Sequence, residues 1–261
     1  MKIFLQISNI VAFVAMVLIN YLSNTGIINN STIGDVSKNL NTLFTPAGYA
    51  FAIWGVIYLL LLGFIIYQGR SLFVRVKDDD FILRTGGWFI LSCIANSAWV
   101  FAWLYEYTAL SVLCILVLLL SLIKIVLNNR MELWDAPLPV IAFLWWPFVV
   151  YSGWVTVASI ANISAWLKKI EWSGLGLSEA FWAVSMIVVA GIINLLLTWT
   201  RNMREFALVG AWALIAIAVA NWDVSPAVMY SALITAVILI SSSGIHGYLN
   251  RATSPLRKLK T

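Results

Sequence analysis

Eight predominantly apolar stretches follow one another along the chain, separated by short polar segments. A helix needs about 20 such residues to cross the hydrocarbon core of a bilayer, and each stretch has roughly that length. The predicted membrane-spanning helices are Ile3–Leu22, Pro46–Tyr67, Gly86–Tyr105, Thr108–Leu127, Pro137–Leu167, Glu179–Thr200, Phe206–Trp222 and Pro226–Leu249. The pattern therefore predicts an all-α, polytopic membrane bundle of about eight transmembrane helices.

Two of these stretches have special features. Lys2 before the first stretch is typical of a signal peptide, but the stretch exceeds an ordinary signal-peptide core and no small-residue cleavage site follows it. We expect it to remain as a spanning helix. The fifth stretch is long enough to tilt or to project beyond the bilayer, and Pro147 within it is expected to kink the helix.

Composition supports a membrane protein. Hydrophobic residues make up 62% of the 261 residues and charged residues only 10%, against about 25% in soluble domains. The net charge of +5 arises from basic residues in short loops, so we expect the bilayer as a partner and no nucleic acid. Cys93 and Cys114 both fall within apolar stretches, which argues against a disulfide or a metal site.

The distribution of Lys and Arg over the loops predicts the orientation. With eight spans, one side of the membrane carries 13 of the 16 basic residues: Lys2, Arg70, Arg75, Lys77, Arg84, Lys124, Arg130, Arg201, Arg204, Arg251, Arg257, Lys258 and Lys260. The other side carries three: Lys38, Lys168 and Lys169. By the positive-inside rule we expect both termini in the cytoplasm, the first loop outside, and residence in a plasma (inner) membrane.

Charged groups are absent from the middle of every predicted span, which disfavours an ion-coupled transporter or a proton pump. Asp78, Asp79 and Asp80 lie in a loop among basic residues, so we interpret them as a solvated, charge-balanced segment rather than a metal site. His246 lies near the cytoplasmic end of the last span. A hydrogen-bonded interfacial histidine is the simpler interpretation there, with a proton or metal site as the alternative.

Polar and aromatic residues recur at helical spacing within three of the stretches. One face of the fifth stretch carries Tyr151, Trp154, Ala158, Asn162 and Trp166. The second carries Pro46, Ala50, Trp54 and Tyr58, and the third carries Asn96, Trp99 and Trp103. Polar groups left unpaired in hydrocarbon are costly, so these faces must meet protein, water or a ligand.

Three inward faces of Trp, Tyr and Asn suit a flat, apolar ligand that bears a few polar groups. The alternative is that the indoles form interfacial belts and the asparagines only bridge helices. Because Asn96 and Trp99 lie in the middle of their stretch rather than at its ends, we favour a ligand pocket. Nothing in the pattern predicts a catalytic residue set or a bound metal.

The same residues resemble the TspO/MBR family of tryptophan-rich sensory proteins, which are related to the mitochondrial translocator protein. In that family a Pro is followed by Trp and Tyr, as Pro46, Trp54 and Tyr58 are here. The N-x-x-W pattern of its third helix is matched by Asn96 and Trp99. The pattern of its fifth helix is matched by Tyr151, Trp154, Ala158, Asn162 and Trp166.

The resemblance implies a five-helix core over residues 1–166. Residues 167–261, with three additional helices and a short basic cytoplasmic tail, have no counterpart in the five-helix family and are expected to be an extension. It implies a binder of a hydrophobic planar ligand, a porphyrin- or haem-type molecule, that acts in sensing or transport. The alternatives are a membrane enzyme that degrades porphyrin-type ligands and a small-molecule transporter. We expect no acid–base catalysis, because the pocket has no titratable set. The small residues Ala98 and Ala102 would allow close helix packing in a homodimer.

Overall fold

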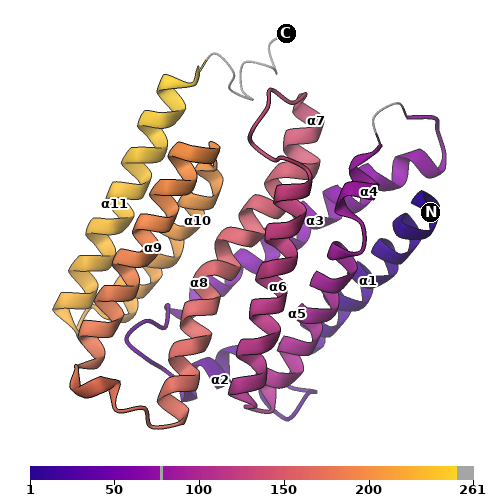
Figure 1. Cartoon of the computed structure of the whole chain (residues 1–261). Coiled ribbons are helices and arrows are strands. Elements are labelled where there is room, and N and C mark those ends of the chain that lie inside the picture. The colour runs from indigo at the N-terminus through magenta and orange to yellow at the C-terminus, as the bar shows by residue number, and fades with distance from the viewer. Residues whose placement is uncertain (77–78, 252–261) are drawn as a thin grey trace.

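The computed structural model describes residues 1–76 and 79–251, and this part of the chain folds as a helical bundle (Figure 1). Five of the charged residues named above lie outside the described residues: Lys77, Asp78, Arg257, Lys258 and Lys260. The long helices are α1 (Lys2–Leu22), α3 (Ile53–Gly69), α5 (Trp88–Leu104), α6 (Thr108–Asn128), α8 (Trp146–Lys169), α9 (Glu179–Arg201), α10 (Arg204–Ala220) and α11 (Pro226–Leu249). The short elements are α2 (Ile33–Asn39), η1 (Gly48–Ala52), η2 (Arg70–Leu72), α4 (Phe81–Thr85), α7 (Leu138–Val140), η3 (Ile141–Trp145) and η4 (Gly174–Gly176).

Each of the eight predicted spans is a helix within the described residues, which confirms the polytopic all-α bundle. Six helical segments there, counting Gly48–Leu72 and Leu138–Lys169 as continuous, are long and apolar enough to cross a membrane. The other two, α5 and α10, have 17 residues each. At 1.5 Å per residue they fall a little short of a hydrocarbon core of about 30 Å.

Helix α8 is the centre of the bundle. It contacts α3 and α6 on one side and α10 on the other, and Figure 1 shows it between the first helices and the α9–α11 group. In the most apolar window of the continuous segment Leu138–Lys169, which ends with α8, 67% of the residues are buried, whereas the value for α1 is 28%. The helix that carries the longest polar and aromatic stripe is therefore the one that is enclosed by protein.

The helix type changes directly before Pro147, where a kink was predicted. The turn before it, η3, is a π-helix, and the chain passes from α7 through η3 into α8 without a break. Proline has no backbone N–H to donate and its ring clashes with the carbonyl one turn earlier, so a wider turn accommodates it.

Helices α9, α10 and α11 pack against one another and join the rest of the bundle through α10. Gly153 of α8 marks the closest approach, because a Cβ atom there would lie 3.1 Å from the carbonyl oxygen of Phe206. Bulkier residues at this position would push α10 away. The three C-terminal helices thus pack against α8 mainly through α10.

The first loop contains a helix that the apolar pattern did not predict. Thr32 caps α2: its hydroxyl accepts a hydrogen bond from the backbone N–H of Asp35, and the Asp35 carboxylate accepts one from the Thr32 N–H. This reciprocal capping box satisfies N–H groups that a helix start leaves unpaired. Ile33 and Val36 are buried, so the helix is fixed against the bundle.

Candidate functional site

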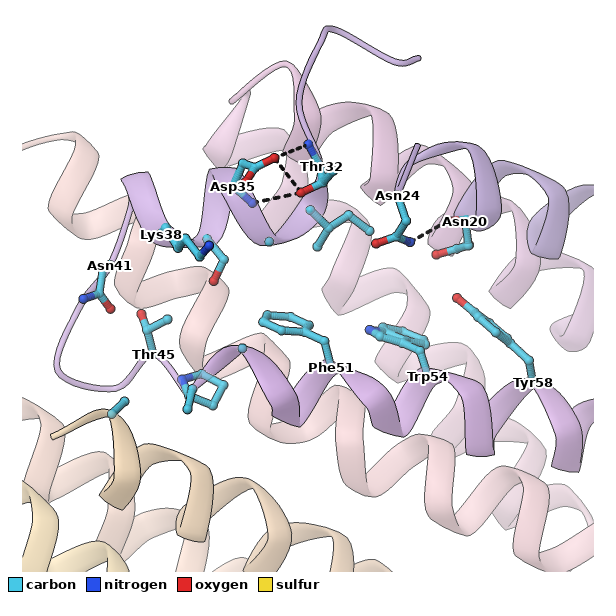
Figure 2. A pocket seen from close by; sticks show the side chains of 17 residues that line it. Asn20, Asn24, Thr32, Asp35, Lys38, Asn41, Thr45, Phe51, Trp54 and Tyr58 are labelled. Carbon is cyan, nitrogen blue, oxygen red and sulfur yellow. Dashed lines mark hydrogen bonds between the residues drawn. The ribbon is translucent and has the colours of Figure 1, made fainter. Parts of the chain in front are cut away.

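A cavity of about 500 Å³ lies between α3, the end of α1 and the first loop with α2. Figure 2 shows Phe51, Trp54 and Tyr58 projecting into it from one side, with Asn20 and Asn24 on the other. A smaller pocket of about 50 Å³ continues from it toward α5 and α8. Both are lined by Ile33, Ser37, Thr45, Pro46, Phe51 and Trp54.

Trp54 stands where the cavity and the inner pocket meet. Its ring stacks on Tyr58 one turn away, with centroids 5.7 Å apart. The rings of Tyr151 and Trp154 meet it edge to face at 5.8 and 6.3 Å, and Trp99 lies 6.3 Å away. The spacing of four residues along α3 therefore builds one aromatic wall, and α5 and α8 complete it.

Trp99 and Trp103 form the second part of the wall. Their rings stack at 6.0 Å because they are four residues apart on α5. The Trp103 indole N–H donates to the carbonyl oxygen of Ile33 at 3.2 Å, and the Trp99 indole N–H donates to Asn162 Oδ1 at 3.3 Å. The first of these bonds ties α2 to the wall, so the helix in the loop forms part of the site.

A chain of amide hydrogen bonds supports the wall from behind. Asn20 Nδ2 donates to Asn96 Oδ1 at 2.6 Å, and Asn96 Nδ2 donates to the Tyr151 hydroxyl at 2.9 Å. Asn96 and Tyr151 are fully buried. Such a network fixes the aromatic rings because each buried polar group has a partner.

The indole N–H groups differ in whether they have a partner. Those of Trp54 and Trp154 are buried and have no hydrogen-bond partner among the described residues. An unpaired buried donor costs about 1–3 kcal/mol. Both side chains line the inner pocket, so a ligand that carries an acceptor oxygen or nitrogen would satisfy them.

The structure brings the predicted site residues together, in two layers. The layer that lines the cavity or the inner pocket consists of Pro46, Trp54, Tyr58, Trp99, Trp103, Trp154, Ala158 and Asn162. Asn96 and Tyr151 lie behind this layer and support it. Asn162 lines the inner pocket but uses its amide within the protein, since its Nδ2 donates to Ser111 Oγ at 3.0 Å.

Several residues of the site were not identified from the sequence pattern. Asn20, Ile33, Ser37 and Phe51 all line the cavity or the pocket. An asparagine within an apolar helix is a signal that could have indicated Asn20, because polar residues in membrane spans face protein or water. The T-x-x-D capping pattern at Thr32 could have indicated α2.

The outer part of the cavity is polar and charged. Asp35 and Lys38 of α2 lie on its rim, as Figure 2 shows. Hydrogen bonds from Thr32 lower the pKa of the exposed Asp35 carboxyl, so the group is ionised at neutral pH. The site therefore combines an aromatic interior with a rim that can meet the polar substituents of a ligand.

The C-terminal part of the chain is hydrogen-bonded to the Leu43–Ala50 segment, which borders the cavity. The Ala47 N–H donates to the carbonyl oxygen of Ala216 at 3.0 Å, and Asn221 Nδ2 donates to the Leu43 carbonyl at 2.9 Å. The Trp212 indole N–H donates to the Ala50 carbonyl at 3.3 Å. Ala220 of α10 also lines the cavity.

The comparison with family models gives one match. The model described as TSPO-like protein matches residues 6–245, a range that includes α9, α10 and most of α11. No curated protein and no solved structure gives a significant match to the chain. The family match covers most of the chain and agrees with the resemblance carried by its aromatic residues. The chain is thus an integral membrane protein that belongs to the TSPO-like protein family.

Proposed function

We propose that the protein binds a hydrophobic planar ligand of the tetrapyrrole class, in sensing or in transport. The observation that carries this proposal is the position of Trp54, whose indole N–H has no partner among the described residues and which lies in the wall of both the cavity and the inner pocket. A flat ring system can stack on this wall, while its polar substituents face Asp35 and Lys38 at the rim.

Size and chemistry support binding rather than acid–base catalysis. The cavity of about 500 Å³ falls within the range of roughly 300–1,000 Å³ that is usual for small-molecule sites. Among the described residues, Asp35 and Lys38 are the only charged ones that line the cavity, both on its exposed rim, and none that lines the inner pocket is Asp, Glu, Lys, Arg or His. Proton transfer by a side chain would require such a group within hydrogen-bond reach of the ligand.

We also propose that residues 1–166 form the ligand-binding core and that residues 167–261 stabilise it. The hydrogen bonds between the α10 region and the Leu43–Ala50 segment support the stabilising role, and Ala220 is the one described residue after 166 that lines the cavity. We propose that the protein lies in a plasma (inner) membrane with both termini on the cytoplasmic side. A homodimer stays a prediction: Ala98 is exposed, but Ala102 is only 2% exposed and packs inside the protomer.

Titration of the purified full-length protein with protoporphyrin IX, haem, a sterol and a carotenoid tests the ligand class. We expect saturable quenching of tryptophan fluorescence by the two tetrapyrroles. Trp54→Phe retains a ring but removes the free N–H, and it should weaken binding, whereas Trp222→Phe at an exposed helix end should not. Equal effects of the two substitutions would contradict the proposal. Loss of the tetrapyrrole absorbance under light would instead indicate an enzyme, and flux into vesicles a transporter.

A further inference from the structure

A second, polar pocket of about 230 Å³ lies at the other end of the bundle from α2. Its walls come from the loop between α6 and α7, from the start of α10 and from the end of α11. Figure 1 shows α7 and the end of α11 far from α2, so this pocket is separate from the aromatic cavity. None of its lining residues is shared with that cavity.

Three side chains in this pocket are more than nine-tenths buried and carry a polar atom without a partner. Glu132, Trp145 and His246 are 8%, 2% and 3% exposed. Glu132 Oε1, Trp145 Nε1 and His246 Nδ1 have no hydrogen-bond partner among the described residues. Buried polar atoms are almost always paired with protein, water or a ligand, so three such atoms in residues that line one pocket mark it as a candidate binding site.

Two charged side chains of opposite sign in the pocket also have one buried atom each without a partner among the described residues. Glu205 Oε2 and Arg204 Nε are buried and lack partners among the described residues. Charged groups taken out of water are costly unless they are paired. A ligand must therefore offer a positive group to the carboxylates and an acceptor to the guanidinium.

The tautomer of His246 gives the pocket another N–H donor besides that of Arg204. Asn250 Nδ2 lies 3.2 Å from His246 Nε2, and an amide nitrogen can only donate, so Nε2 is the acceptor. The ring proton of the neutral imidazole is then on Nδ1. Trp145 Nε1, His246 Nδ1 and Arg204 Nε are three N–H donors suited to one carboxylate.

We propose that this pocket binds a small zwitterion, an amino-acid-sized molecule with an ammonium group and a carboxylate. The ammonium group would pair with Glu132 and Glu205, and the carboxylate with Arg204, His246 and Trp145. Trp134 and Trp145, which both line the pocket, meet edge to face at 5.3 Å and would form an aromatic wall for the ammonium group.

The size of the pocket supports a small ligand. Its volume of about 230 Å³ is below the roughly 300–1,000 Å³ of sites for drug-sized molecules. Burial together with the nearby Glu205 raises the pKa of Glu132 to about 8. A bound ammonium group would compensate the Glu132 charge and favour its ionised form. Among the described residues, no group of three or more His, Cys, Asp or Glu side chains that could hold a metal ion is present.

Calorimetric titration of the full-length protein in detergent tests the proposal. The probes are glycine, β-alanine and 4-aminobutanoate, in which the two charged groups are increasingly far apart. Butylamine and butanoate are matched controls with a single charge. We expect at least one zwitterion to bind saturably and both controls to bind at least about tenfold more weakly, because each leaves one charged side unpaired.

Two variants locate the binding. Glu205→Gln removes one charge with little change of shape, Arg204→Gln removes one charge and shortens the side chain, and each should weaken zwitterion binding by about tenfold or more. Glu171→Gln, in the loop between α8 and α9, is the control and should have no effect.

The proposal is overturned if no zwitterion binds to the folded wild-type protein, which would mean that the pocket holds only water. It is equally overturned if butylamine binds as tightly as the zwitterions, or if both pocket variants retain full affinity. The comparison of the five probes on the wild-type chain decides between these outcomes even if a variant fails to fold.

Discussion

The backbone N–H of Ala47 donates a hydrogen bond across 3.0 Å to the carbonyl oxygen of Ala216, near the C-terminal end of α10. This bond joins the segment that leads into the aromatic cavity to the C-terminal helices. Pro46 and Phe51, which lie on either side of it, both line the cavity. The position of these side chains therefore depends on a helix more than 160 residues further along the chain.

A first prediction follows from the neighbouring bond between Asn221 and Leu43. Asn221→Ala removes the donor to the Leu43 carbonyl, which should lower the free energy of unfolding by about 1–3 kcal/mol and weaken ligand binding at the cavity. Thermal unfolding and fluorescence titration measure the two effects. The exposed Asp223 provides a control, and Asp223→Asn should leave both values unchanged. Unchanged ligand affinity in Asn221→Ala would show that α10 does not position the cavity.

A second prediction concerns Trp154. We expect Trp154→Ala to lower ligand affinity roughly ten- to a hundredfold, because the loss of an aromatic wall reduces the binding free energy by about 1–3 kcal/mol. The same substitution should destabilise the protein by about 3–5 kcal/mol, because the side chain is only 2% exposed. Trp222→Ala, at a side chain that is 62% exposed, is the control. If both variants, measured as folded protein, lose affinity equally, the stripe serves packing alone.

A third prediction concerns Asn162. Its Oδ1 accepts from the Trp99 indole N–H and its Nδ2 donates to Ser111 Oγ. Asn162→Leu leaves the buried Trp99 donor unpaired, so we expect a loss of about 1–3 kcal/mol in stability together with a change in ligand preference. Chemical unfolding measures the first effect and competition between porphyrins and sterols the second. Wild-type stability would contradict the structural role of this bond.

A fourth prediction concerns orientation. Lys38, Lys168 and Lys169 lie at one end of the bundle: the Lys168 ammonium donates to the Asn41 carbonyl, and Lys169 pairs with Glu106 at 3.1 Å. By the positive-inside rule this end should be exoplasmic. In a background in which Cys93 and Cys114 are replaced by Ser, a membrane-impermeant thiol reagent should label Ser31→Cys and not Thr253→Cys. The reverse labelling would overturn the orientation.

A fifth prediction concerns pH. Burial raises the pKa of Glu132 from its ordinary value of 4.5 to about 8, with Glu205 opposing its ionisation and Arg204 favouring it; Asp135 and His246 line the same pocket. Between about pH 4.5 and about pH 8, Glu132 is therefore protonated in the folded state and ionised in the unfolded state. Stability should therefore fall as pH rises through this window, and level off above it.

The measurement is the melting temperature from about pH 5 to about pH 9. Glu132→Gln removes the titrating group and should flatten the slope that this residue causes. Asp35→Asn, on the exposed α2, is the comparison that should leave the slope at neutral and higher pH unchanged, since the pKa of Asp35 is already low. An unaltered slope in Glu132→Gln would assign the pH dependence to another group.

The sequence by itself determined the membrane class, the helices and most of the aromatic wall. Apolar length fixes which segments can span a bilayer, and helical periodicity places Trp54 beside Tyr58 and Trp99 beside Trp103 before any tertiary contact exists. Those relationships are local, so spacing along the chain is enough to predict them.

Only the tertiary structure decided which polar groups are already paired and which are free. Asn96 turns away from the cavity because Asn20 and Tyr151 hold it, and Trp54 keeps a free N–H because no partner lies near it among the described residues. The contact of α10 with the Ala47 segment and the meeting of Glu132 with Arg204 and His246 join residues far apart in sequence. Such pairings depend on how helices pack, which no periodicity along one helix specifies.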